Sequence, residues 1–265
     1  MKYDVIIFGG QSNMQGQTEA LSECAQKEGC FEYRYLTDSL VSLKNPVGEY
    51  IKTDGTAGCP FVGDPVAEED KFVEWKNGLC VGAATDGNTN LVPSFCKSYR
   101  EACSRDVVAV HASKGATYIS DWLKGTPGYE MIVKKTKAAV LKAKNVENIY
   151  FVWLQGESDA CNSLTKEDYE KSITELKSSL KEDLGIKKFG IIRVGHFAGD
   201  KRDDEIINAQ ETVCQKDDDF VMLTRLTSEL ELTKKYMNPY AKGHFSARGL
   251  ELIGEVAGAV LGEIE

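Results

Sequence analysis

Short apolar runs rich in β-branched residues recur along the chain, and longer amphipathic stretches separate them. Such runs predict buried strands, here at residues 4–8, 107–111, 149–154, 189–194 and 220–223. Apolar residues at three- and four-residue spacing predict helices at residues 130–143, 166–184, 204–215 and 247–261. Alternating strands and helices are typical of βαβ units, so we expect an α/β fold with a mainly parallel five-stranded sheet.

The stretch from residue 18 to about residue 90 has a different character. It is rich in glycine and proline and shows little periodicity. We interpret it as a loop-rich insertion over the sheet edge with a short strand or two, and long loops of this kind are often functional. Because composition does not shift sharply anywhere, we expect a single domain over residues 1–265.

Composition and charge narrow the classes of partner. The chain has 265 residues, 42% of them hydrophobic, and a formal net charge of -9. Excess negative charge argues against nucleic acid and anionic membranes as partners, and no apolar run approaches the length of a membrane span. The first strand follows the N-terminal methionine almost directly, which favours a cytoplasmic location. The eight cysteines include no Cys-x-x-Cys pair, so we expect reduced and mostly buried thiols, and no metal or cofactor.

The first predicted strand leads into a turn that carries a serine. The run Val5-Ile6-Ile7-Phe8-Gly9-Gly10-Gln11-Ser12-Asn13-Met14 lacks the lysine of a phosphate-binding loop and the glycine spacing of a dinucleotide fingerprint. It also lacks the second glycine of an α/β-hydrolase elbow. Ser12 at a strand-to-helix turn is either a nucleophile at the carboxyl edge of the sheet or a capping residue.

Three further segments are expected at the same edge and supply the groups that acyl transfer needs. They are Ser113-Lys114-Gly115, Gln155-Gly156-Glu157 and the late segment around His244. A serine needs a base, for which histidine is the usual residue, and a carboxylate commonly orients that histidine. The backbone N–H groups of Ser12 and Gly115 and the side-chain amide of Gln155 could stabilise an oxyanion.

Together these elements resemble the SGNH hydrolases, and within them the sialate O-acetylesterase and acetylxylan esterase group (carbohydrate esterase family 6). The resemblance rests on Gly10-Gln11-Ser12-Asn13-Met14, Gln155-Gly156-Glu157 and the late His244, and covers nearly the whole chain. It implies a flavodoxin-like three-layer α/β/α fold and cofactor-free hydrolysis of O-acetyl esters on sugars. It also implies that Ser12 is the nucleophile, that His244 is the base, and that Ser12, Gly115 and Gln155 form the oxyanion hole.

Two positions depart from the pattern of that family. Many SGNH enzymes have an aspartate three residues before the histidine, where this chain has Ala241. We therefore expect Glu157 to orient His244, with Asp159 as the second choice and a Ser–His dyad as the third. Ala116 stands where the family often has glycine, and its methyl group should be tolerated unless its φ is positive.

Residues near these segments are candidates for substrate contacts. They are Gln11, Asn13, Lys114, Thr117 and Trp122. Asn13 is also expected to fix its turn by side-chain hydrogen bonds, and His196 follows a strand and could lie at the rim. The expected substrate is an acetylated sialic acid or xylo-oligosaccharide of small size, and the oligomeric state stays open. The alternatives are an SGNH lipase or thioesterase acting on longer acyl chains, and a carbohydrate-binding protein without turnover.

Overall fold

The computed structural model describes residues 2–22, 28–84 and 89–264, and its centre is a seven-stranded sheet in the order β3-β2-β6-β1-β7-β8-β9. All neighbouring strands run parallel except β3, which is antiparallel to β2. The strands are β1 (Tyr3–Gly10), β2 (Cys30–Arg34), β3 (Ser39–Ser42), β6 (Asp106–Ser113), β7 (Val146–Leu154), β8 (Lys188–Ile192) and β9 (Phe220–Thr224). A separate two-stranded sheet joins β4 (Ile51–Lys52) and β5 (Leu79–Val81).

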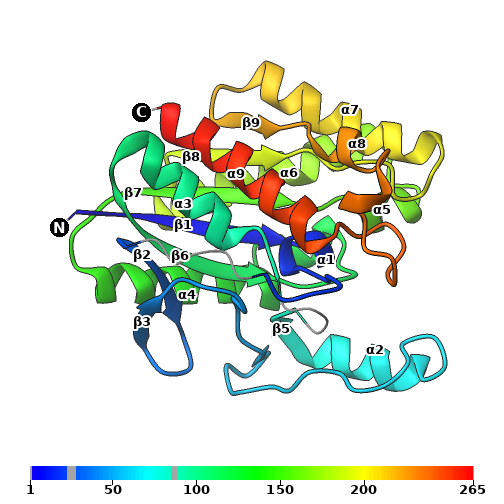
Figure 1. Cartoon of the computed structure of the whole chain (residues 1–265), viewed down its shortest axis with the longest axis horizontal. Coiled ribbons are helices and arrows are strands. Elements are labelled where there is room, and N and C mark those ends of the chain that lie inside the picture. The colour runs from blue at the N-terminus through cyan, green and yellow to red at the C-terminus, as the bar shows by residue number, and fades with distance from the viewer. Residues whose placement is uncertain (1, 23–27, 85–88, 265) are drawn as a thin grey trace.

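Helices cover both faces of the large sheet, which gives the three-layer α/β/α arrangement (Figure 1). On one face α3 (Val92–Cys103) packs against α9 (Ala247–Glu263), where a Cβ on Gly258 would lie 2.1 Å from the backbone oxygen of Phe95. The other face carries α4 (Pro127–Ala143), α6 (Lys166–Leu184) and α7 (Lys201–Lys216). Short helices complete the chain at α1 (Ser12–Gln15), α2 (Glu69–Gly78), α5 (Glu157–Cys161), α8 (Thr227–Leu230), η1 (Ile119–Trp122) and η2 (Lys234–Tyr236).

The register of the central strands brings the predicted segments together. Gly10 at the end of β1 pairs with Ser113 of β6 on one side and with Leu154 of β7 on the other. A Cβ on Gly10 would lie 2.1 Å from the backbone oxygen of Leu154, so only glycine fits here. The turns after these three strands therefore begin at the same level of the sheet edge.

The sequence-based prediction was right about the α/β class and the mainly parallel sheet, but wrong about the number of strands. All five predicted strands are present, and β2 and β3 extend the sheet beyond them. Both come from the segment interpreted as loops, which also forms β4, β5 and α2. Helix α2 was missed because none of its residues is buried, so it has no apolar face to detect.

The cysteines are less uniformly buried than expected. Cys30, Cys80 and Cys96 are buried, whereas Cys59 and Cys161 are exposed, and Cys24 lies outside the described residues. Within the described ranges, no helix is long and apolar enough to cross a membrane.

Candidate active site

Ser12 and His244 meet at the carboxyl edge of the sheet. Ser12 is the first residue of α1, directly after the β1 turn, and is 5% exposed. Its Oγ lies 2.8 Å from Nε2 of His244, which comes from the loop before α9. The other ring nitrogen, Nδ1, lies 3.1 Å from the carbonyl oxygen of Lys242. The contact between Ser12 Oγ and His244 Nε2 is the hydrogen bond through which a histidine can remove the proton from a serine.

Asn13 holds the His244 loop (residues 238–246). Its Oδ1 accepts a hydrogen bond of 3.2 Å from the N–H of Phe245, and its Nδ2 lies 3.4 Å from the carbonyl oxygen of Gly243. The loop is further closed by a 2.8 Å bond from the N–H of Asn238 to the carbonyl oxygen of His244. Asn13 is 3% exposed, and these contacts make it a bridge between α1 and the loop.

Both candidate acids are placed differently from the expectation. Glu157 Oε1 accepts a 2.8 Å hydrogen bond from Asn13, and its Oε2 has no hydrogen-bond partner within the described chain. Asp159 accepts from the N–H of Ile119 and from the amide of Gln155. Burial raises the pKa of both carboxyls, that of Asp159 to about 6. The hydrogen bonds of Glu157 and Asp159 are therefore made to neighbouring amide and N–H groups rather than to the imidazole.

Gly115 lies against Ser12, and the residue that follows it has an unusual backbone conformation. A Cβ on Gly115 would lie 3.4 Å from Cβ of Ser12, and its N–H donates to Oε1 of Gln15 at 2.9 Å. Ala116 has a φ of 57°, which is the condition under which its methyl group was expected to be unfavourable. The turn therefore carries strain at the residue after Gly115.

Gln155, the third expected oxyanion donor, is hydrogen-bonded within the site. Its side chain is fully buried, and its Nε2 donates to Oε1 of Gln11, to the carbonyl oxygen of Thr117 and to the carboxylate of Asp159. Gln11 also accepts from the N–H of Ser158 at 3.2 Å, so it joins the turns after β1 and β7. These internal acceptors use the amide hydrogens that the sequence analysis assigned to an oxyanion.

The remaining candidate substrate contacts form hydrogen bonds with neighbouring residues and line a second cavity. Lys114 is 7% exposed, and its Nζ donates to the carbonyl oxygens of Lys76 and Leu79, so it ties the insertion to the sheet edge. Burial lowers the pKa of Lys114 to about 8. Thr117 accepts a 3.0 Å bond from Nε1 of Trp122, and both side chains are buried. These residues line a separate cavity of about 200 Å³.

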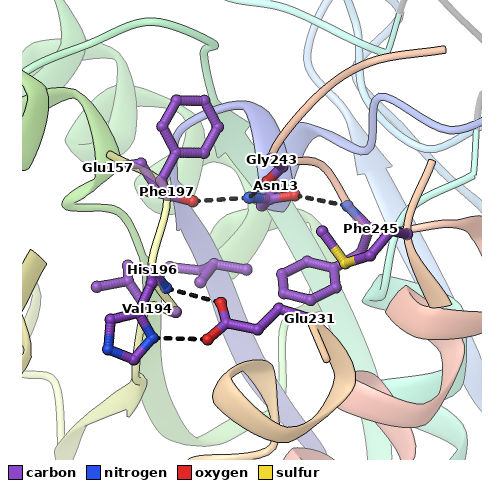
Figure 2. Close-up of a pocket in the computed structure, with 11 residues that line it drawn as sticks. Asn13, Glu157, Val194, His196, Phe197, Glu231, Gly243 and Phe245 are labelled. Atoms are coloured by element: carbon purple, nitrogen blue, oxygen red, sulfur yellow. Dashed lines mark hydrogen bonds and ion pairs between the residues drawn. The ribbon is translucent and has the colours of Figure 1, made fainter. Parts of the chain in front are cut away.

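A small cavity of about 20 Å³ lies beneath the His244 loop, and its lining includes residues that the sequence did not indicate (Figure 2). The ring of Phe197 stands edge-on to the His244 ring, with 5.7 Å between their centroids. Behind it, Nδ1 of His196 lies 2.6 Å from Oε1 of Glu231, which confirms His196 near this rim. Within the described ranges, no group of three or more His, Cys, Asp or Glu side chains is arranged to hold a metal ion.

The three-layer fold, with a serine and a histidine paired at the carboxyl edge of its sheet, places the chain in the SGNH class. A family model described as "Carbohydrate esterase, sialic acid-specific acetylesterase" matches residues 2–257. The chain belongs to this family.

Similar proteins agree with this placement. The chain is 29% identical over 114 residues to a probable carbohydrate esterase of Arabidopsis thaliana (At4g34215), and this match covers 43% of each protein. The crystal structure of that protein superimposes with a TM-score of 0.66 at 19% identity, covering 97% of both chains. NanS gives 0.61 at 12% identity over 98% of this chain and 97% of its own. At these identities, the structural likeness shows the fold.

Proposed function

We propose that the chain removes O-acetyl groups from small carbohydrates with Ser12 as nucleophile and His244 as general base. The observation that carries this proposal is the 2.8 Å hydrogen bond between Ser12 Oγ and His244 Nε2. It joins a residue of the first turn to one of the last loop, and it lies at the edge where open α/β sheets bind ligands. Family membership over residues 2–257 supplies the acetylated sugar as substrate class.

In this mechanism His244 Nε2 takes the Ser12 proton while Oγ attacks the acetyl carbonyl carbon. His244 then returns the proton to the sugar oxygen as the ester bond breaks, and water, deprotonated by His244, releases acetate from Ser12. We assign the oxyanion to the backbone N–H groups of Ser12 and Gly115. The Gly115 N–H already faces an amide oxygen, that of Gln15, so a substrate oxygen would replace an oxygen of similar kind.

We expect a short acyl group rather than a long chain. The family model that matches residues 2–257 is described as an acetylesterase, and this supports acetyl transfer over the lipase or thioesterase alternative.

The test is acetate release from acetylated sialic acid and acetylated xylo-oligosaccharides, with p-nitrophenyl esters of increasing chain length alongside. Ser12→Ala should lower kcat by about 10³–10⁶-fold, as loss of a serine nucleophile does in other hydrolases. Activity should fall steeply beyond the shortest acyl chains. Equal acetate release by wild type and Ser12→Ala would contradict the proposal, and sugar binding without release would favour a binding protein.

A further inference from the structure

One side chain connects the nucleophile's turn to both sides of the base. Asn13 follows Ser12 in α1 and contacts the residues that flank His244: Phe245 through Oδ1 at 3.2 Å and Gly243 through Nδ2 at 3.4 Å. Figure 2 shows Asn13 between Glu157 on one side and Phe245 on the other. The position of His244 is thus fixed relative to α1, the short helix that also carries Ser12.

Glu157 is a third hydrogen-bond partner of the Asn13 amide and supports its orientation. A carboxylate only accepts hydrogen bonds, so Nδ2 of Asn13 must face Glu157 Oε1, at 2.8 Å. Oδ1 then necessarily points toward the N–H of Phe245, which can only donate. If the amide were turned over, an oxygen would face a carboxylate and an NH₂ group would face an N–H. Glu157 therefore favours the same orientation that the Phe245 N–H and the Gly243 carbonyl require, and its hydrogen bond holds the amide in that orientation.

We propose that Asn13 is the positioning residue that aligns His244 with Ser12, and that Glu157 acts through Asn13 rather than on the imidazole. The proposal rests on the proposed function, since it concerns the base of that reaction. It gives a physical role to Glu157 at a site where Ala241 occupies the place of the family's usual aspartate. The loop is held by its backbone, and the imidazole Nδ1 faces the carbonyl of Lys242.

Removing the Asn13 amide should release the loop and lower kcat. Asn13→Ala is expected to lower kcat about 100-fold with KM changed less than about threefold, because displacement of a catalytic group by about 1 Å costs this much. The matched control is Asn148→Ala, which removes an amide that donates to the Asp4 carboxylate at 2.9 Å, at the opposite end of the sheet. It should leave kcat within about twofold. A kcat of Asn13→Ala equal to that of Asn148→Ala would overturn the proposal.

Substitutions of Glu157 separate indirect action from direct action on the imidazole. Glu157→Gln keeps an oxygen that can accept from Asn13, so its kcat should fall less than about tenfold. Glu157→Ala removes this acceptor from the Asn13 amide, so its kcat should fall further. The double variant Asn13→Ala/Glu157→Ala should be no slower than Asn13→Ala alone, as expected for residues acting in one chain of contacts. An acid that served His244 directly would instead cost about 10⁴-fold on conversion to its amide.

A readout independent of turnover keeps the proposal separate from the proposed function. Hydrogen exchange of the Phe245 amide, whose N–H donates to Asn13, should be faster in Asn13→Ala and in Glu157→Ala, and unchanged in Asn148→Ala. If wild type hydrolyses no acetyl ester, the proposed function fails, while this exchange still tests whether Asn13 holds the His244 loop. Unchanged Phe245 exchange in Asn13→Ala would show that Asn13 does not hold the loop, even if the enzyme is active. If Asn13→Ala does not fold, Glu157→Ala, which keeps the Asn13 side chain, supplies the same comparison.

Discussion

Two neighbouring loops at the site are held by opposite chemistry. The segment at residues 197–200 is held by the buried carboxylate of Asp203, which accepts hydrogen bonds of 2.7–3.3 Å from four successive backbone N–H groups. The His244 loop is instead held by the amide of Asn13, which faces a carbonyl on one side of the histidine and an N–H on the other. A carboxylate collects donors only, whereas an amide bridges a donor and an acceptor and adds no charge beside the base.

The two loops touch at one point, so a change in one reaches the other. The Phe197 ring packs edge-on to His244, and a Cβ on Gly243 would lie 2.3 Å from the Phe197 ring. His196, which directly precedes the first loop, is paired with Glu231 at the end of α8, whereas His244 is paired with Ser12. A histidine with an acid partner is therefore present beside the site, but it is not the histidine that contacts the serine.

The largest effect on stability should come from removing the carboxylate that gathers the first loop. Asp203→Ala leaves four N–H groups without their acceptor, and we expect a loss of about 3–4 kcal/mol in the free energy of unfolding. Urea denaturation measures this loss. The exposed neighbour Asp204 provides the control, because Asp204→Ala should change stability by less than about 0.5 kcal/mol. Equal midpoints for the two variants would show that the carboxylate does not hold the loop.

A third histidine, which lies in β6 away from both loops, separates pH effects on folding from those on the base. His111 is fully buried, its Nε2 lies 2.8 Å from Ser113 Oγ, and desolvation lowers its pKa to about 3 from 6.5. As pH falls below 6.5, His111 binds a proton in the unfolded chain but not in the folded chain, so the free energy of unfolding decreases. Its contribution is complete above pH 6.5 and disappears progressively toward pH 3.

The test compares wild type with His111→Gln in urea at pH 7.5 and pH 4.5. Between these two pH values, wild type should lose about 2–3 kcal/mol more than the variant, since each pH unit below 6.5 costs about 1.4 kcal/mol. Equal losses in the two proteins would mean that His111 does not resist protonation. Loss of turnover at a pH where wild type remains folded can then be attributed to the site.

The smallest effect should arise where the two loops meet. Gly243 has a φ of 77° and lies against Phe197, so Gly243→Ala both strains the backbone and pushes the ring. We expect kcat to fall about tenfold, with a loss of about 1–2 kcal/mol in stability. Gly199 is the matched control, because its φ is 81° but nothing lies within 4 Å of an added Cβ. Gly199→Ala should lose stability through backbone strain but keep its kcat. Equal kcat values for Gly243→Ala and Gly199→Ala would show that the two loops are not coupled.

The sequence predicted the parts of the fold that depend on contiguous apolar runs. The Ser12 turn follows such a run, and His244 could be proposed because the chain has only three histidines. A short strand or two was expected between residues 18 and 90, but β2 and β3 could not be located there because that stretch is polar and rich in glycine. The role of Glu157 was beyond sequence reasoning, since it depends on which amide lies beside its carboxylate, and that amide is 144 residues away.

The central claim is that Ser12, activated by His244, carries the acetyl group during turnover. The most direct measurement is mass spectrometry of enzyme quenched during hydrolysis of an acetyl ester, followed by peptide mapping. The account predicts an acetyl group on the peptide that contains Ser12, and none in Ser12→Ala. It also predicts that the adduct accumulates if His244→Ala slows its hydrolysis more than its formation. Turnover by wild type with the acetyl group on another residue, or undiminished turnover in Ser12→Ala, would contradict it.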